Sequence, residues 1–124
     1  MEKPERQKTG KEGEDFACAF LRKKGWKIIE RNFRQAYGEL DIVAKSLDKT
    51  LIFVEVKTTS QFRPDGVRPE DQMTRAKISK FKKIAEGYVN RYPKLVSEKM
   101  GFRLDVLALT RVGNDFIVNH YENI

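Results

Sequence analysis

The stretches GELDIVA (residues 38–44) and LIFVEVKT (residues 51–58) decide the fold. Both are rich in β-branched residues, and a short polar turn at residues 47–50 separates them. Two such runs at this distance are typical of antiparallel strands joined in a β-hairpin. The second run is apolar enough to be central, so we expect a sheet built around it.

Hydrophobic periodicity predicts the remaining elements. Apolar residues at helical spacing predict two helices, and extended stretches predict three more strands. The expected ranges are 9–25 and 69–92 for the helices, and 26–33, 102–109 and 115–121 for the strands. The order helix, three strands, helix, two strands is typical of an α/β sandwich in which helices flank a central mixed sheet of about five strands.

Local signals set the expected boundaries of these elements. Thr9 can cap the first helix, and Gly25 is a natural stop at its end. Pro69 suits the first turn of the second helix. We expect residues 1–8 to form a flexible arm and residues 9–124 to fold as one domain, because a chain of 124 residues can bury a single core.

Composition excludes several classes of protein. The single cysteine, Cys18, excludes an internal disulfide and a multi-cysteine zinc site, and the single histidine, His120, argues against histidine-based catalysis. No apolar run approaches the ~20 residues of a membrane span, and the polar N-terminus is unlike a signal peptide. We therefore expect a cytoplasmic protein without a membrane partner.

The net charge of +7 lies in one segment. Residues 73–103 contain nine basic and two acidic residues, so the rest of the chain is neutral. A segment of this kind is either a solvated helix face or a contact for a polyanion such as nucleic acid.

Three charged residues lie within the hairpin, where a fold alone does not require them. Alternation along the second strand places Glu55 and Lys57 on one face, and the hairpin can place Asp41 beside Glu55. In the first strand, alternation puts Leu40 and Ile42 on one face and Asp41 on the other. Buried carboxylates cost several kcal/mol unless they are paired or bound to a cation.

Two carboxylates and a lysine are typical of a site for Mg²⁺ or Mn²⁺, because hard cations prefer oxygen ligands. Such an ion polarises a phosphoryl oxygen, while Lys57 positions a water or stabilises developing charge. The alternative is a plain ion pair between Glu55 and Lys57, or an edge strand with both side chains in water. Glu14 is either a third carboxylate of this site or a residue that stabilises the helix N-terminus.

These residues resemble the PD-(D/E)xK nuclease core, with Asp41 as the first acid and Glu55-x-Lys57 as the second acid and the lysine. More closely, an ordered set of blocks resembles the YraN-like family of predicted endonucleases, which is related in fold to archaeal Holliday-junction resolvases. The blocks, within residues 10–109, are GEDFACAFLRKKGW, ERNFR, GELDIVA, FVEVKT, the helix with Ala76 and Lys77, and RLDVLAL.

The resemblance implies a restriction-endonuclease-like three-layer sandwich with a metal-dependent phosphodiesterase site. It makes Asp41 and Glu55 metal ligands, Lys57 the catalytic lysine, and Glu14 the acid of the first helix. Gln72 resembles a polar residue that some members place beside the site. Leu40 stands where the motif has its proline, a frequent variation that keeps the carboxylate in place.

Basic residues after the hairpin are candidate contacts to nucleic acid, and we favour this over a plain solvated surface. They are Arg63 and Arg68 in the loop after Lys57, and Arg75, Lys77, Lys80 and Lys83 on the second helix. Four aromatic residues could stack on unpaired bases, although such residues in a short domain more often belong to the core. These are Trp26, Phe33, Tyr37 and Phe62.

Asp105 shares a strand face with Arg103 and can pair with it.

We therefore predict a Mg²⁺- or Mn²⁺-dependent endonuclease that hydrolyses phosphodiester bonds in DNA. A branched or structured substrate follows from the resolvase kinship alone. The alternative is a nucleic-acid-binding module that keeps the fold without catalysis. Cutting two symmetric strands would require a homodimer, which the sequence does not decide.

Overall fold

The computed structural model describes residues 5–60 and 73–124. The helices of this part are α1 (Glu5–Lys23), α2 (Arg75–Arg91) and the short 3-10 helix η2 (Pro93–Leu95). The strands are β1 (Lys27–Gln35), β2 (Gly38–Lys45), β3 (Leu51–Ser60), β4 (Phe102–Val112) and β5 (Asp115–Tyr121). Apart from η2, which the sequence analysis did not predict, the order of elements is the expected one.

The strands form one mixed sheet in the order β1-β2-β3-β4-β5. β3 and β4 are parallel, from the pair of Leu51 and Phe102 to the pair of Ser60 and Arg111, and all other neighbours are antiparallel. The parallel pairing needs a long connection, and α2 lies within it. The predicted α/β fold with a central five-stranded mixed sheet is confirmed.

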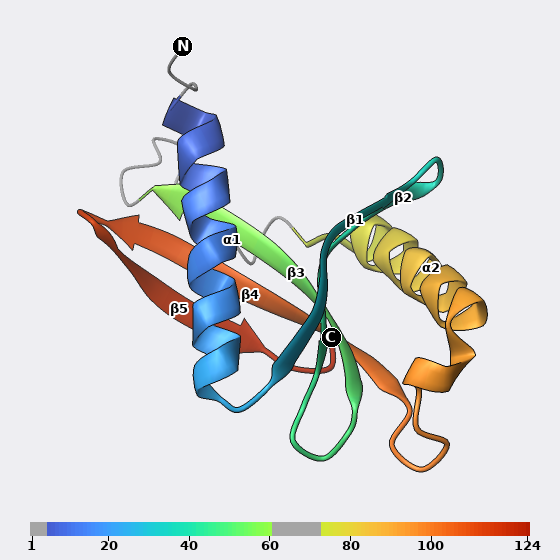
Figure 1. Ribbon diagram of the computed structural model, residues 1–124. Coiled ribbons are helices and arrows are strands. Elements are labelled where there is room, and N and C mark those ends of the chain that lie inside the picture. The colour runs from blue at the N-terminus through green and yellow to red at the C-terminus, as the bar shows by residue number, and fades with distance from the viewer. Residues whose placement is uncertain (1–4, 61–72) are drawn as a thin grey trace.

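One long helix covers each face of this sheet (Figure 1). α1 buries Ala17 and Leu21 against one face, and α2 buries Phe81 and Tyr88 against the other. Burial contributes about 1.5–3 kcal/mol for a large apolar side chain, which holds the three layers together. Neither of these described helices has the length and apolar character needed to cross a membrane.

Both helices begin at other residues than expected. α1 starts at Glu5, so the predicted cap at Thr9 is wrong and the helix includes part of the predicted arm. The reason is that Glu, Arg, Gln and Lys are good helix formers, so the helix already begins on the N-terminal side of Thr9. α2 starts at Arg75, because the Thr74 side chain accepts a hydrogen bond from the Lys77 N–H at 3.2 Å. Pro69, expected in the first turn, lies outside the described residues.

The side chains of β2 do not alternate regularly between the two faces of the sheet. Leu40 packs with Val43 in the core beneath α2, whereas Ile42 packs in the core beneath α1. The prediction that Leu40 and Ile42 share a face is therefore wrong. The break lies opposite Asn32 of β1, between the pairs of Arg31 with Ile42 and Phe33 with Leu40, and Asn32 has a left-handed backbone with φ 54°. This irregular backbone of the neighbouring strand accompanies the change of face between Leu40 and Ile42.

The turn between β1 and β2 packs directly on α2. Gly38 has φ +151°, and a Cβ atom there would lie 2.3 Å from the Cδ1 atom of Ile84. Only glycine allows this conformation and this approach. The far end of the β1–β2 hairpin consequently rests beside α2 (Figure 1).

Replacing Gly38 tests this contact. Gly38→Ala should lower the free energy of unfolding by about 1–3 kcal/mol, because the new methyl group overlaps Ile84 and the backbone is strained. Urea unfolding followed by circular dichroism measures the change. The control is Gly10→Ala in α1, where a Cβ meets nothing within 4 Å. This control should be neutral or slightly stabilising, and equal destabilisation by both variants would contradict the tight contact.

Candidate functional site

The site begins where the pairing of β2 with β3 ends. The last pair of this ladder is Ile42 with Val54, so Asp41 would stand opposite Glu55 if the ladder continued. Instead, the Asp41 carboxylate accepts the Val56 N–H at 2.8 Å. A side chain thus replaces a backbone carbonyl as the partner of β3, and it fixes Asp41 beside Glu55 as the sequence predicted.

The electrostatic surroundings of Asp41 are unusual for an aspartate. Burial, and next the charge of Glu55, raise the pKa of Asp41 from 3.8 to about 7. Glu14 acts in the same direction, whereas the Val56 N–H and Lys57 act against it. Two nearby carboxylates in a desolvated place disfavour ionisation, and an added cation relieves this repulsion. The acidic pair is therefore suited to bind positive charge.

Lys57 lies next to this acidic pair. Its Nζ atom is 3.2 Å from Glu55 Oε1, and each side chain is 22% exposed. The predicted shared face of Glu55 and Lys57 is confirmed. The ion pair is half-buried rather than solvated, so both groups keep defined positions at the edge of a cavity.

Glu14 reaches the same region from α1. It contributes to the raised pKa of Asp41, which places it near the acidic pair. Its Oε2 atom is 3.8 Å from Arg31 Nη2, and Arg31 donates to Asp15 at 2.7 Å. Gly13 allows α1 to approach β3, since a Cβ there would lie 2.4 Å from Thr58 Oγ1. The helix acid is thus held at the sheet by a close helix–strand contact.

A cleft of about 460 Å³ opens beside Glu55 and Lys57. Its walls come from the β1–β2 hairpin, β3 and α2, and its other charged lining residues are Arg34, Glu39, Lys77 and Lys80. The sequence predicted Lys77 and Lys80 as phosphate contacts. It missed Arg34 and Glu39, because only the packing of the β1–β2 turn on α2 brings them to the site.

Two other described residues predicted to contact nucleic acid, Arg75 and Lys83, do not line this cleft. Lys83 lines a neighbouring cavity of about 410 Å³ together with Tyr37 and Lys80. Arg75 is exposed at the start of α2 and lines neither cavity. Arg63, Arg68 and Gln72 fall outside the described residues.

The donor set fits a hard divalent cation held by two carboxylates. Among residues 5–60 and 73–124, no group of three or more His, Cys, Asp or Glu side chains is arranged to hold a metal ion. Asp41 and Glu55 are nevertheless adjacent and supply oxygen ligands. Mg²⁺ usually takes one or two carboxylates and completes its shell with water and substrate phosphates. Glu14 belongs to the electrostatic surroundings of the pair rather than to a formed three-acid cluster.

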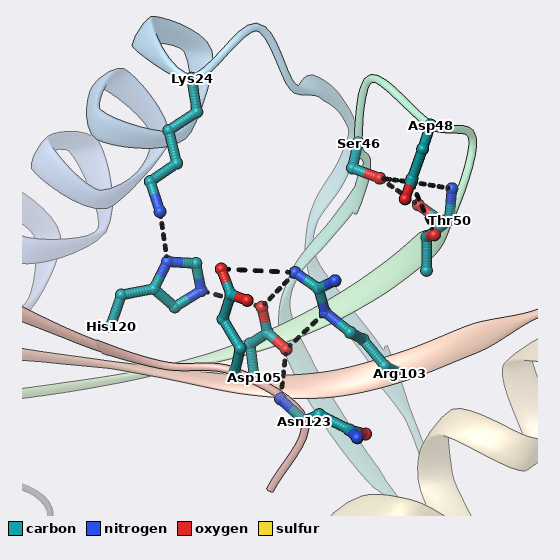
Figure 2. Close-up of polar contacts among 9 residues, drawn as sticks. Lys24, Ser46, Asp48, Thr50, Arg103, Asp105, His120 and Asn123 are labelled. Atoms are coloured by element: carbon teal, nitrogen blue, oxygen red, sulfur yellow. Dashed lines mark hydrogen bonds and ion pairs between the residues drawn. The ribbon is translucent and has the colours of Figure 1, made fainter. Parts of the chain in front are cut away.

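A second buried aspartate serves a different purpose (Figure 2). Asp105 accepts from Arg103 at 3.0 Å, from His120 at 2.8 Å and from the Asn123 N–H at 3.0 Å. Burial alone would raise the pKa of Asp105, but these hydrogen bonds hold it below its ordinary value. The predicted pairing with Arg103 is confirmed. The sequence analysis missed the part of His120, which joins β5 to β4.

The fold and the site define an α/β protein that carries an acidic pair and a lysine beside a basic cleft. A family model described as "Uncharacterised protein family UPF0102" matches residues 13–109. The chain belongs to this family, in agreement with its resemblance to the YraN-like proteins. A UPF0102 protein from Campylobacter concisus is 40% identical over 110 residues, which cover 89% of this chain and 90% of the relative. One from Dictyoglomus thermophilum is 37% identical over 120 residues, covering 93% and 98%.

The raised pKa of Asp41 predicts a pH dependence of stability in EDTA. The folded chain keeps the Asp41 proton up to about pH 7, whereas the unfolded chain releases it near 3.8. The folded state therefore binds more protons in this interval, and stability falls as pH rises through it. Asp41→Asn keeps an acceptor for the Val56 N–H and removes the titration. Between pH 5 and pH 8, the free energy of unfolding of this variant should rise by roughly 3 kcal/mol relative to that of wild type, as measured by urea unfolding.

Asp48→Asn is the matched control for this measurement. Hydrogen bonds from Ser46 and then Thr50 lower the pKa of Asp48 to about 2, so its titration lies below the measured window. The difference in free energy of unfolding between Asp48→Asn and wild type should stay constant from pH 5 to pH 8. A constant difference for Asp41→Asn as well would mean that Asp41 ionises at its ordinary pKa.

Proposed function

We propose that this chain is a Mg²⁺- or Mn²⁺-dependent endonuclease that hydrolyses phosphodiester bonds in DNA. The observation that carries the proposal is the position of Glu55 and Lys57. Both lie close enough to Asp41 for their charges to change the pKa of its carboxyl, and both line a cleft with Lys77 and Lys80. Groups suited to a cation and groups suited to phosphate thus meet in one place.

The arrangement of elements also supports the proposal. An α-helix with an acid, an antiparallel hairpin with Asp41, and a central strand with Glu55 and Lys57 follow one another in the chain. This order resembles the restriction-endonuclease-like core of the PD-(D/E)xK nucleases. By this resemblance, Asp41 would be the first acid of the motif, Glu55 the second acid and Lys57 its lysine.

The residues of the chain would share the work as follows. Asp41 and Glu55 would hold the cation through their carboxylate oxygens. When bound, the ion would supply positive charge that polarises a phosphoryl oxygen and makes a water more acidic. Lys57, oriented by Glu55 at 3.2 Å, would position the attacking water or stabilise charge that develops on the phosphate. Lys77 and Lys80 would hold the neighbouring phosphates in the cleft.

A non-catalytic nucleic-acid-binding module is the second candidate. The observation that favours it is that Glu55 already pairs with Lys57, while no third carboxylate completes a metal cluster among the described residues. Such a module would bind nucleic acid through the same basic cleft. The two candidates differ in whether Asp41 and Lys57 matter for cleavage.

A cleavage assay separates the two candidates. Four-way junction, flap, single-stranded and duplex DNA, with RNA alongside, are incubated with the full chain in Mg²⁺ or Mn²⁺. We expect cleavage of at least one DNA, and we expect Asp41→Asn and Lys57→Ala each to slow it roughly 100-fold or more. EDTA should abolish it. Gel electrophoresis of labelled strands measures the products.

Two exposed residues provide matched controls for the cleavage assay. Asp115→Asn on β5 and Lys27→Ala on β1 repeat the same chemical changes away from the site, and both should keep the wild-type rate. Cleavage that survives both site substitutions would point to a contaminant or to another site. Binding without cleavage of any DNA would favour the module.

The role of the cleft lysines predicts a salt dependence. Each phosphate contact steepens the plot of log affinity against log salt by roughly 0.9 for duplex DNA. Lys80→Ala should therefore reduce the slope by about 0.9, measured by fluorescence anisotropy in EDTA. Lys82→Ala, an exposed neighbour on α2 that lines neither cavity, should leave the slope unchanged. Equal slopes for all three proteins would remove Lys80 from the phosphate contacts.

A further inference from the structure

Tyr37 is the aromatic candidate that remains available to a ligand. Of the four aromatic residues that could stack on bases, Trp26 and Phe33 are buried in the two cores, and Phe62 lies outside the described residues. Tyr37, in the turn between β1 and β2, is 52% exposed. The structure thus distinguishes it from the aromatic residues that fill the cores.

The ring of Tyr37 is nevertheless held in place. A Cβ atom added to Gly87 of α2 would lie 3.3 Å from the Tyr37 hydroxyl and 3.5 Å from Cε2. The ring edge therefore rests on the helix at the one position without a side chain. A ring held against the protein with half of its surface in water can accept a planar ligand at little cost in side-chain entropy.

The surroundings of the ring combine apolar surface with positive charge. Tyr37, Ile84 and Gly87 form the apolar part of the 410 Å³ cavity, and Lys80 and Lys83 add two ammonium groups. Neither lysine has a carboxylate partner among the described residues. An aromatic face beside these two cations suits a ligand that is both planar and anionic, which is the chemistry of a nucleotide.

This cavity continues the cleft of the candidate active site. Tyr37 and Lys80 line both cavities, while Glu55 and Lys57 line the larger one. A strand whose phosphate lies at Lys57 can therefore extend past Lys80 and present its next bases to Tyr37. The path runs over the β1–β2 turn, which Gly38 anchors on α2.

We propose that the cavity of Tyr37, Lys80 and Lys83 binds one unpaired nucleobase and its phosphate, next to the bond that is cut. The inference rests on the proposed function and names its substrate class, DNA with a junction between paired and unpaired strands. A base within a duplex is covered by its neighbours on both faces, so only an unpaired base can stack on the ring. No base edge is read, so the subsite accepts any base.

A binding experiment without catalysis tests the subsite. The full chain is titrated in EDTA against three labelled DNAs: a splayed duplex with single-stranded arms, a fully paired duplex of equal length, and a single strand. The splayed duplex carries 2-aminopurine in the first unpaired position. Wild type should bind the splayed duplex more tightly than the paired one and should quench 2-aminopurine, because stacking quenches this base.

Variants of Tyr37 separate stacking from a structural role. Tyr37→Ala should weaken binding of the splayed duplex roughly 10-fold, within the range known for base–aromatic stacking, and should abolish quenching. It should leave binding of the paired duplex unchanged. Tyr37→Phe keeps the ring and should behave like wild type. Ile117→Ala, which changes an apolar residue of β5 that is 57% exposed, is the matched surface control.

Other results would contradict the subsite, the stacking on Tyr37 or the proposed function. If Tyr37→Ala weakens both duplexes equally, or neither, the subsite is excluded while the nuclease proposal stands. If Tyr37→Phe fails like Tyr37→Ala, the hydroxyl contact with α2 and not stacking explains the effect. If wild type binds none of the DNAs in a salt-dependent way, the proposed function fails and the subsite with it.

Discussion

The rest of the site depends on one hydrogen bond, between the Asp41 carboxylate and the Val56 N–H at 2.8 Å. It ends the β2–β3 ladder after Ile42 and Val54, so that β2 leaves β3 while β3 continues beside β4 to Ser60. Without it, the Val56 N–H would need another partner, such as a carbonyl of β2. Because β2 departs here, the β1–β2 turn can reach α2 and enclose a cleft beside Lys57.

Two buried aspartates show how their surroundings decide what a carboxylate does. Burial would raise the pKa of Asp105, but hydrogen bonds from His120 and Arg103 lower it and favour the anion, which ties β4 to β5 (Figure 2). Asp41 faces Glu55, and its pKa is raised to about 7. The first is already neutralised and has no need of a ligand. The Val56 N–H and Lys57 compensate the second only in part, and groups with such perturbed pKa values cluster where a cation or a proton takes part in function.

Sequence reasoning reached the adjacency of Asp41 and Glu55 because a hairpin of known turn position fixes which residues stand opposite each other. It failed for Leu40, which lies on the other face from Ile42, opposite the left-handed backbone of Asn32 in β1. A backbone conformation of β1 leaves no signal in the sequence of β2. The position of Tyr37 over Gly87 was equally inaccessible, because it depends on how a turn packs on a helix far along the chain.

The face of the sheet on which Glu55 and Lys57 lie also decides which helix contributes residues to their site. In β3, Leu51 and Phe53 point into the core beneath α2, and simple alternation sends Glu55 and Lys57 to that same side. There they meet Lys77 and Lys80, within the segment that holds all of the excess charge. A shift of one residue would turn them toward the face that α1 covers, away from Lys77 and Lys80. The alternation of side chains in β3 is therefore what brings the acidic hairpin and the basic helix α2 to one site.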